Sequence, residues 1–178
     1  MQGRMGRLSG CFGRHLDELA TLGGEIEFAF HVATDGGVMW VYPVASTVGH
    51  LETERCLTEV AKSTRFPRPH GGEAEFKWSV GFDPPSDVRA PTEWPHTHIE
   101  EIVNEHAPAL LSECRPAGAS YQYEVTAYVA PGGQVLSAGA SVEDPAAIDS
   151  VACLVAGVRA WTMPDPGSYQ AKVTFDLR

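Results

Sequence analysis

Two stretches of this 178-residue chain align with each other without a gap when the first is shifted by 97 positions. They run from Phe28 to Phe82 and from Val125 to Leu177. Identical residues coincide at Val32/Val129, Gly36/Gly133, Val38/Val135, Cys56/Cys153, Leu57/Leu154, Pro67/Pro164 and Pro69/Pro166. An internal repeat of this length predicts two structural units of one design, and it has to be recognised before the fold is assigned.

The repeat divides the chain into a first unit over residues 1–83, a linker over residues 84–95 and a second, diverged unit over residues 96–178. The linker holds four prolines and Trp94, and we expect it to be ordered or semi-rigid. Units of this size bury a small core. We therefore expect them to pack on each other or to be held by covalent links.

Each unit is expected to contain a helix, two strands, a second helix and a third strand. In the first unit, apolar periodicity predicts helices over residues 8–22 and 50–63 and strands over 26–32, 38–45 and 74–82. In the second unit, it predicts strands over residues 123–129, 135–142 and 171–177. Thr97 and Glu100 have the spacing of a capping box at the start of one helix, and Asp144-Pro145 opens the other. The pattern predicts an α+β fold in which each unit is a three-stranded antiparallel sheet with two helices on one face.

The first unit also carries a series of short motifs. They are Phe30-x-Val32, Asp35-Gly36-Gly37-Val38, Ser46-Thr47, Glu54-Arg55-Cys56-Leu57 and Arg65-Phe66-Pro67-x-Pro69-x-Gly71-Gly72. Over nearly all of residues 8–82, this series resembles the TonB-like C-terminal domain of the myxobacterial adventurous-gliding-motility proteins. The second unit keeps Cys153-Leu154 and Met163-Pro164-x-Pro166 but loses the paired glycines, so it resembles a diverged second copy.

The resemblance implies an adaptor protein of a Gram-negative cell envelope rather than an enzyme. Such a domain takes up a short segment of a partner protein as an extra strand at a sheet edge; backbone hydrogen bonds give affinity and alternate side chains give selectivity. By analogy with the family, the last strand of each unit provides that edge. The partner-binding residues implied are Glu73, Glu75, Lys77, Ser79, Gln170, Lys172, Thr174 and Asp176.

Four cysteines are present, one in the leading helix and one in the second helix of each unit. Four cysteines allow three connectivities. The repeat favours Cys11–Cys56 and Cys114–Cys153, which would join the two helices of each unit. The alternative is four buried free thiols in a cytoplasmic protein. No Cys-x-x-Cys occurs, so neither a zinc site nor a thioredoxin-like redox pair is supported.

The net charge is −10, which argues against nucleic acid and anionic membrane as partners, because both require basic patches. No run of about 18 apolar residues exists, so direct membrane insertion is not expected. The first ten residues lack the apolar core of a signal peptide. Taken literally this indicates a cytoplasmic protein. The resemblance instead favours the periplasm or cell envelope, with a leader or anchor outside the given sequence.

The best cluster of potential metal ligands comprises His96, His98, Glu101, Glu105 and His106. It has no recognised metalloenzyme spacing, and helix capping with a solvated acidic face explains most of it. The chain has no Gly-x-Ser-x-Gly elbow, Walker loop or Gly-x-Gly-x-x-Gly motif. We therefore expect no catalytic site, no metal and no cofactor.

Three functions follow in order of preference. The first is a non-enzymatic envelope adaptor that binds protein partners by β-strand addition. The second is a structural subunit of a larger envelope or membrane-associated complex. The third is a small metal-dependent enzyme that uses the His96–His106 cluster.

Overall fold

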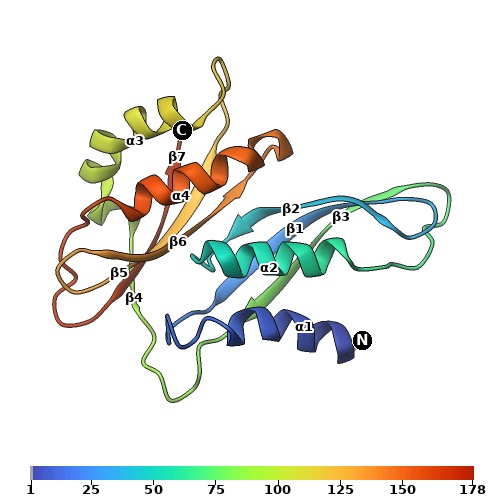
Figure 1. Cartoon of the computed structure of the whole chain (residues 1–178), viewed down its shortest axis with the longest axis horizontal. Coiled ribbons are helices and arrows are strands. Elements are labelled where there is room, and N and C mark those ends of the chain that lie inside the picture. Colours follow the sequence, from blue (N-terminus) through green and yellow to red (C-terminus); the bar gives the residue numbers. More distant parts are fainter. Residues whose placement is uncertain (1) are drawn as a thin grey trace.

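The computed structural model describes residues 2–178, and the chain folds as an α+β protein with two sheets (Figure 1). This confirms the predicted fold class. In chain order the elements are α1 (Gln2–Gly13), β1 (Gly24–Val32), β2 (Val38–Ser46), α2 (Leu51–Lys62), β3 (Ala74–Phe82), β4 (Thr92–Trp94), η1 (His96–His98), α3 (Glu100–Cys114), β5 (Tyr123–Val129), β6 (Val135–Val142), η2 (Pro145–Ser150), α4 (Val151–Arg159) and β7 (Ala171–Leu177).

The antiparallel strands of the two sheets share one order and one register. The first sheet has the order β2-β1-β3, and in the second sheet β6, β5 and β7 take the corresponding places. Ile26 faces Val80 in the first sheet, and Tyr123 faces Leu177 in the second. These two pairs are related by the 97-residue shift. The second sheet differs from the expected three strands, because β4 adds to it in parallel with β7.

The two hairpins turn at equivalent glycines. Gly36 and Gly133 have φ angles of 88° and 85°, in the region that favours glycine. A β-carbon at either position would overlap a backbone carbonyl oxygen, that of Phe66 or Met163. The amides of Phe66 and Met163 each donate to the glycine carbonyl at 2.9 Å. Each hairpin tip is thus tied to the loop that precedes the third strand, which explains why these glycines recur in the repeat.

The helix expected over residues 8–22 has the wrong limits. It begins earlier, and α1 ends at Gly13. Residues 14–22 form turns, in which the Leu19 amide donates to the His15 carbonyl and the Leu22 amide to the Leu19 carbonyl, both at 2.9 Å. Leu19 and Leu22 are buried, as they would be on a helix face, so their spacing alone did not distinguish the two structures.

The expected capping box of Thr97 and Glu100 does not form. Thr97 lies inside the short 3-10 turn η1, and α3 starts after Ile99, which makes no side-chain cap. The turn is set by Pro95, whose carbonyl accepts the His98 amide at 3.0 Å. Asp144 does act as a cap, but of the 3-10 turn η2, where its carboxylate accepts the Ala146 amide at 2.8 Å.

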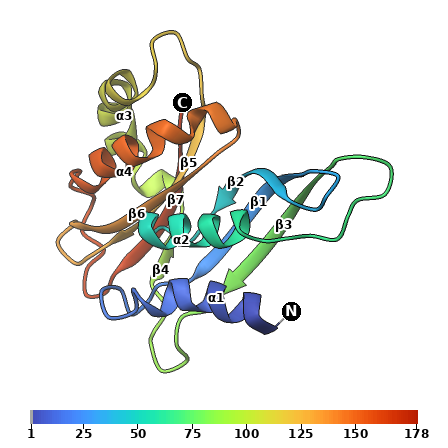
Figure 2. The same ribbon diagram turned by 45° about the vertical axis from the view of Figure 1, so that its right-hand side comes forward.

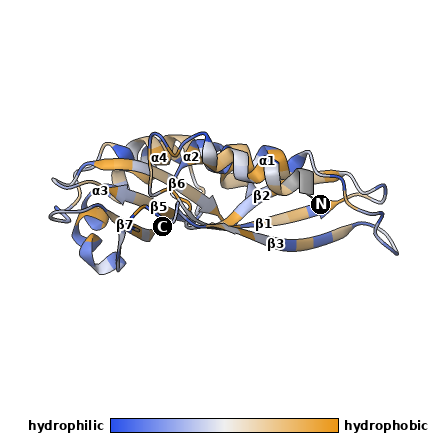
Figure 3. Cartoon of the chain, turned by 90° about the horizontal axis from the view of Figure 1, so that it is seen from below, coloured by the Kyte–Doolittle hydropathy of each residue, from blue (hydrophilic) through white to orange (hydrophobic). Residues whose placement is uncertain are grey.

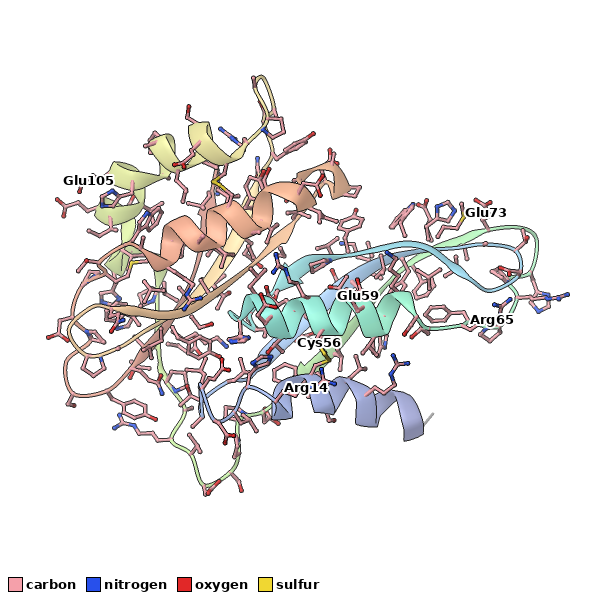
Figure 4. All side chains as sticks on the ribbon, viewed as in Figure 1. Arg14, Cys56, Glu59, Arg65, Glu73 and Glu105 are labelled. Carbon is pink, nitrogen blue, oxygen red and sulfur yellow. A yellow bond between two sulfur atoms is a disulfide. The ribbon has the colours of Figure 1, made fainter. Side chains whose placement is uncertain are left out.

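Both predicted disulfides are present. Cys11 is bonded to Cys56 and Cys114 to Cys153, with Cα–Cα distances of 5.7 and 5.6 Å. The first bond joins α1 to α2, and the second joins the end of α3 to α4 (Figure 4). Disulfides are typical of a non-reducing environment outside the cytoplasm. Within residues 2–178, no helix has the length and apolar character needed to cross a bilayer.

Helices α1, α2 and α4 lie on the same side of the strands (Figure 3). In β1, the alternate residues Ile26, Phe28, Phe30 and Val32 turn toward α1 and α2 and are at most 1% exposed. The corresponding residues of β5 form the centre of a second cluster with α3 and α4. The core is therefore two apolar clusters, one per sheet, each closed by helices.

The two units interlock where β2 and α2 of the first unit lie against β6 of the second, and β2 also contacts β5. Tyr42 of β2 packs into the apolar cluster of the second unit, and Tyr128 of β5 packs into that of the first. The Tyr128 hydroxyl donates to the Gly23 carbonyl at 3.0 Å and accepts the Gly23 amide at 3.3 Å. Thr126 Oγ1 donates to the Ser46 carbonyl at 3.0 Å. Apolar packing and satisfied polar groups together hold the units in one arrangement.

Removing one disulfide should lower the free energy of unfolding by about 4 kcal/mol, because each bond reduces the conformational entropy of the unfolded chain. The closed loops span 45 and 39 residues, so Cys11→Ala/Cys56→Ala and Cys114→Ala/Cys153→Ala should lose similar amounts. Urea unfolding of both variants measures this. Thiol counting on the unreduced, denatured protein should find no free thiol, and four free thiols would contradict the pairing.

Candidate functional site

Strand β3 forms an open margin of the first sheet (Figure 2). It pairs with β1 along all nine residues, and no strand in the described part of the chain pairs with its other edge. Only Val80 is fully buried along its length. An edge strand with free backbone groups is the place where another chain can add.

Two large aromatic side chains are exposed on this strand. Phe76 is 36% and Trp78 is 40% exposed, although they lie directly opposite Phe30 and Phe28, which are buried. The Phe76 ring stacks on Phe30 with centroids 5.1 Å apart. It also meets Phe66 edge-on at 5.1 Å. Phe76 and Trp78 together are called the aromatic ledge, in which Phe76 is held in place by Phe30 and Phe66.

The opposite face of β3, with Glu73 directly before the strand, carries the predicted partner-binding residues of the first unit. All of them are exposed, namely Glu73, Glu75, Lys77 and Ser79. His31 on β1 lies between the two acids, with Nε2 2.7 Å from Glu73 Oε2 and Nδ1 3.7 Å from Glu75 Oε1. Lys77 Nζ lies 3.3 Å from Glu27 Oε2. Glu73 lies toward the end of the first unit that points away from the second (Figure 4).

The equivalent edge of the second unit is occupied. Thr92, Glu93 and Trp94 of β4 lie beside Ala171, Lys172 and Val173 of β7, and the Thr92 amide donates to the Gln170 carbonyl at 3.0 Å. Trp94 packs on the apolar cluster of the second unit. The apolar residues of β7 are at most 5% exposed, namely Ala171, Val173, Phe175 and Leu177. Beyond β4, residues 174–176 border a groove of about 580 Å³ that α3 also lines.

The predicted partner-binding residues on β7 make contacts within the molecule. Lys172 is 7% exposed, and its Nζ donates to the Gly23 carbonyl at 2.9 Å, across the boundary between the units. Burial lowers the pKa of Lys172. Thr174 Oγ1 lies 2.8 Å from Thr126 Oγ1, and Asp176 pairs with Arg178 at 2.6 Å. Gln170 is half-buried. The eight residues thus form two sets: those on β3 and just before it are exposed, and most of those on β7 and just before it are buried or bonded within the molecule.

The five residues of the His96–His106 cluster do not converge on one point in the described part of the chain. His98 packs its ring against Trp94, with centroids 5.3 Å apart. His106 packs against Trp161 at 5.6 Å. Glu101 and Glu105 are exposed on α3, and Glu105 points outward (Figure 4). His96 borders the groove beside β7. Two of the three histidines pack against tryptophan rings. In the described part of the chain, Glu101 and Glu105 do not join them in a group that could hold a metal.

A different trio of potential metal ligands lies where the turn after α1 meets the start of α2. Glu18 Oε2 is 3.6 Å from His15 Nδ1 and 3.9 Å from His50 Nε2. His50 Nδ1 accepts the Thr53 amide at 3.1 Å, as the N-cap of α2. That bond places the proton of the neutral ring on Nε2. Binding a metal at Nε2 would move that proton to Nδ1, which could then no longer accept the Thr53 amide, so the cap would be lost.

A carboxyl group with a strongly perturbed pKa, that of Glu54, lies between the units. Its side chain is fully enclosed: Oε1 accepts the Ser46 hydroxyl at 2.6 Å and Oε2 accepts the Ala140 amide of β6 at 3.0 Å. Gly139 makes room for it, because a β-carbon there would overlap the carboxyl group. Burial raises the pKa of Glu54 to about 7, although both hydrogen bonds act in the opposite direction. Sequence reasoning missed this group, since its helix position predicts only a charged side chain.

Glu54 should make stability fall as the pH rises. In the folded protein its pKa is raised from 4.5 to about 7, so the unfolded chain releases its proton first. Stability from this group is full below about pH 4.5 and is lost between pH 4.5 and 7, by at most about 1.4 kcal/mol per pH unit. In Glu54→Gln the amide oxygen can accept the Ala140 N–H and the amide nitrogen can donate to the Ser46 hydroxyl, and the side chain has no proton to release. It should be more stable than wild type by about 3 kcal/mol at pH 8.

Urea unfolding between pH 4.5 and 8 measures this difference. Glu59→Gln, at an exposed position on the same helix, is the matched control and should keep the wild-type slope. A slope that is unchanged in Glu54→Gln would mean that other groups cause it.

The exposed aromatic residues of β3 should matter little for folding. Trp78 and Phe175 occupy equivalent positions under the 97-residue shift, but only Phe175 is buried, at 5% exposure. Trp78→Ala should cost about 1 kcal/mol of unfolding free energy, whereas Phe175→Ala should cost about 3–5 kcal/mol. Thermal and urea unfolding of the pair test this. Equal losses would show that Trp78 serves the core rather than an exposed surface.

Comparison of this chain with protein-family models, with curated proteins and with solved structures finds no match in any of the three.

Proposed function

We propose that this protein is a non-enzymatic adaptor of a bacterial cell envelope that binds an extended segment of a partner protein along β3. The single observation that carries the proposal is the open edge of β3, where Phe76 and Trp78 stay exposed beside a buried aromatic cluster. Monomeric proteins seldom leave such groups uncovered on an edge strand without a use for them. The resemblance of residues 8–82 to TonB-like domains supports the same mode of binding.

An added strand would pair with the free backbone groups of this edge and cover its exposed aromatic rings. Its backbone would pair with the free amides and carbonyls of β3, which supplies affinity that is independent of sequence. Side chains on one of its faces would cover Phe76 and Trp78, and those on the other would meet Glu75 and Lys77. Phe76 is fixed by its contacts with Phe30 and Phe66, so binding over this ring needs little ordering of the protein.

The two disulfides support a periplasmic site of action. They tie the covering helices of each unit together, as suits a small protein in a non-reducing compartment. A rigid frame with an open edge at β3 is also suited to an adaptor, because the bound segment alone has to become ordered.

Selection of displayed peptides on the folded protein tests the proposal. Peptides selected on wild type should lose binding to Trp78→Lys, which places a charge in the aromatic ledge, and should keep binding to Asp176→Lys, a matched change at an exposed position of β7. Hydrogen exchange should show protection of β3 amides on binding.

Protection confined to β7 would contradict the proposal, as would equal binding to both variants. Assembly of the purified protein into a stable complex that covers β3 would favour the alternative, a structural subunit.

A further inference from the structure

The chain itself contains an example of a strand added to this kind of edge. In the second sheet, Thr92, Glu93 and Trp94 run parallel to Ala171, Lys172 and Val173. Under the 97-residue shift, which also relates the pairing registers of the two sheets, the residues that receive β4 correspond to Ala74, Glu75 and Phe76. These three residues begin β3, whose outer edge is open.

The side chains of β4 match those of β7 in size and in charge. Trp94 lies beside Val173, which is fully buried, and packs on the same apolar cluster. Glu93 lies beside Lys172, and the attraction between them favours the charged form of the lysine. One position of the added strand therefore covers an apolar residue, and the preceding position carries the charge opposite to its neighbour.

At β3 the same positions have different chemistry. Glu75 stands where β7 has Lys172, so the charge is reversed. Phe76 stands where β7 has Val173, but it is 36% exposed. Lys77 follows where β7 has Thr174. A strand with the charge pattern of β4 would thus place an acid beside an acid. Glu75 is held only by a contact of 3.7 Å to His31, which leaves its carboxylate available.

We infer that the segment bound at β3 runs parallel to it and carries a basic side chain beside Glu75, an apolar or aromatic side chain beside Phe76 and an acidic side chain beside Lys77. The inference rests on the proposed function and specifies its partner. Charge complementarity selects the order basic–apolar–acidic, and the parallel direction follows from β4 on β7.

Two peptides of identical composition test the charge order. One contains Thr-Lys-Trp-Glu-Val and the other Thr-Glu-Trp-Lys-Val, with the same flanking residues. The first should bind wild-type protein about tenfold more tightly, because two opposite-charge neighbours become two like-charge neighbours in the second. The variant Glu75→Lys/Lys77→Glu should reverse this preference. Both positions are exposed, and thermal unfolding verifies that the variant is folded.

A nitroxide label at the peptide's amino terminus tests the direction. Parallel addition should broaden the amide resonances of Gly72 and Ala74, at the start of β3. Antiparallel addition would broaden those of Gly81 and Phe82 instead. The same peptide with the label chemically reduced is the control.

The outcomes separate the inference from the function on which it rests. Equal affinities for the two peptides, a preference that the double variant does not reverse, or antiparallel addition would overturn the inference and leave strand addition at β3 intact. If neither peptide perturbs β3 and the displayed-peptide selection also finds no β3 ligand, both fail.

Discussion

The molecule depends on the contact between its two units, in which β2 and α2 of the first lie against β6 of the second and β2 also meets β5. Tyr42 and Tyr128 cross the boundary in opposite directions, and each is buried in the other unit's apolar cluster. The polar groups that this contact removes from water are bonded across it, as with Thr126 to Ser46 and Lys172 to Gly23. Units of about 80 residues gain through this contact the burial that neither could provide alone.

The same strand design has two different outcomes at the two sheet edges. In the second unit the chain supplies β4 from its own linker, and every apolar residue of β7 is covered. In the first unit no described segment reaches β3, and aromatic side chains at equivalent positions stay exposed. The contrast makes one edge part of the internal architecture and leaves the other as the surface on which the proposed function rests.

Local patterns in the sequence predicted most of the architecture. Alternation at Phe76, Trp78 and Val80 indicated β3, and the repeat gave both disulfide pairings. The strand β4 was missed because three residues among prolines carry no periodicity. These features of the fold depend on patterns within one element or on the repeat, which a sequence displays directly.

The candidate site was predictable only in part. Exposure of Glu75 and Lys77 agrees with an edge strand, but alternation cannot show which of two edges stays open. The burial of Glu54 and Lys172 was hidden, because their partners lie 86 and 149 positions away along the chain. The cap by His50 was also missed, since histidine is an uncommon N-cap residue.

The contact of Glu54 with Gly139 has a consequence for how this protein can change over evolutionary time. The acid fills the space that the missing side chain leaves, so the size of the residue at one position limits the size at the other. A larger residue at 139 is admissible only after residue 54 becomes shorter, and a shortened residue 54 leaves a void that favours enlargement at 139. Changes of side-chain size at these two positions are therefore expected to accumulate as compensating pairs, which links one residue of each half of the chain in evolution.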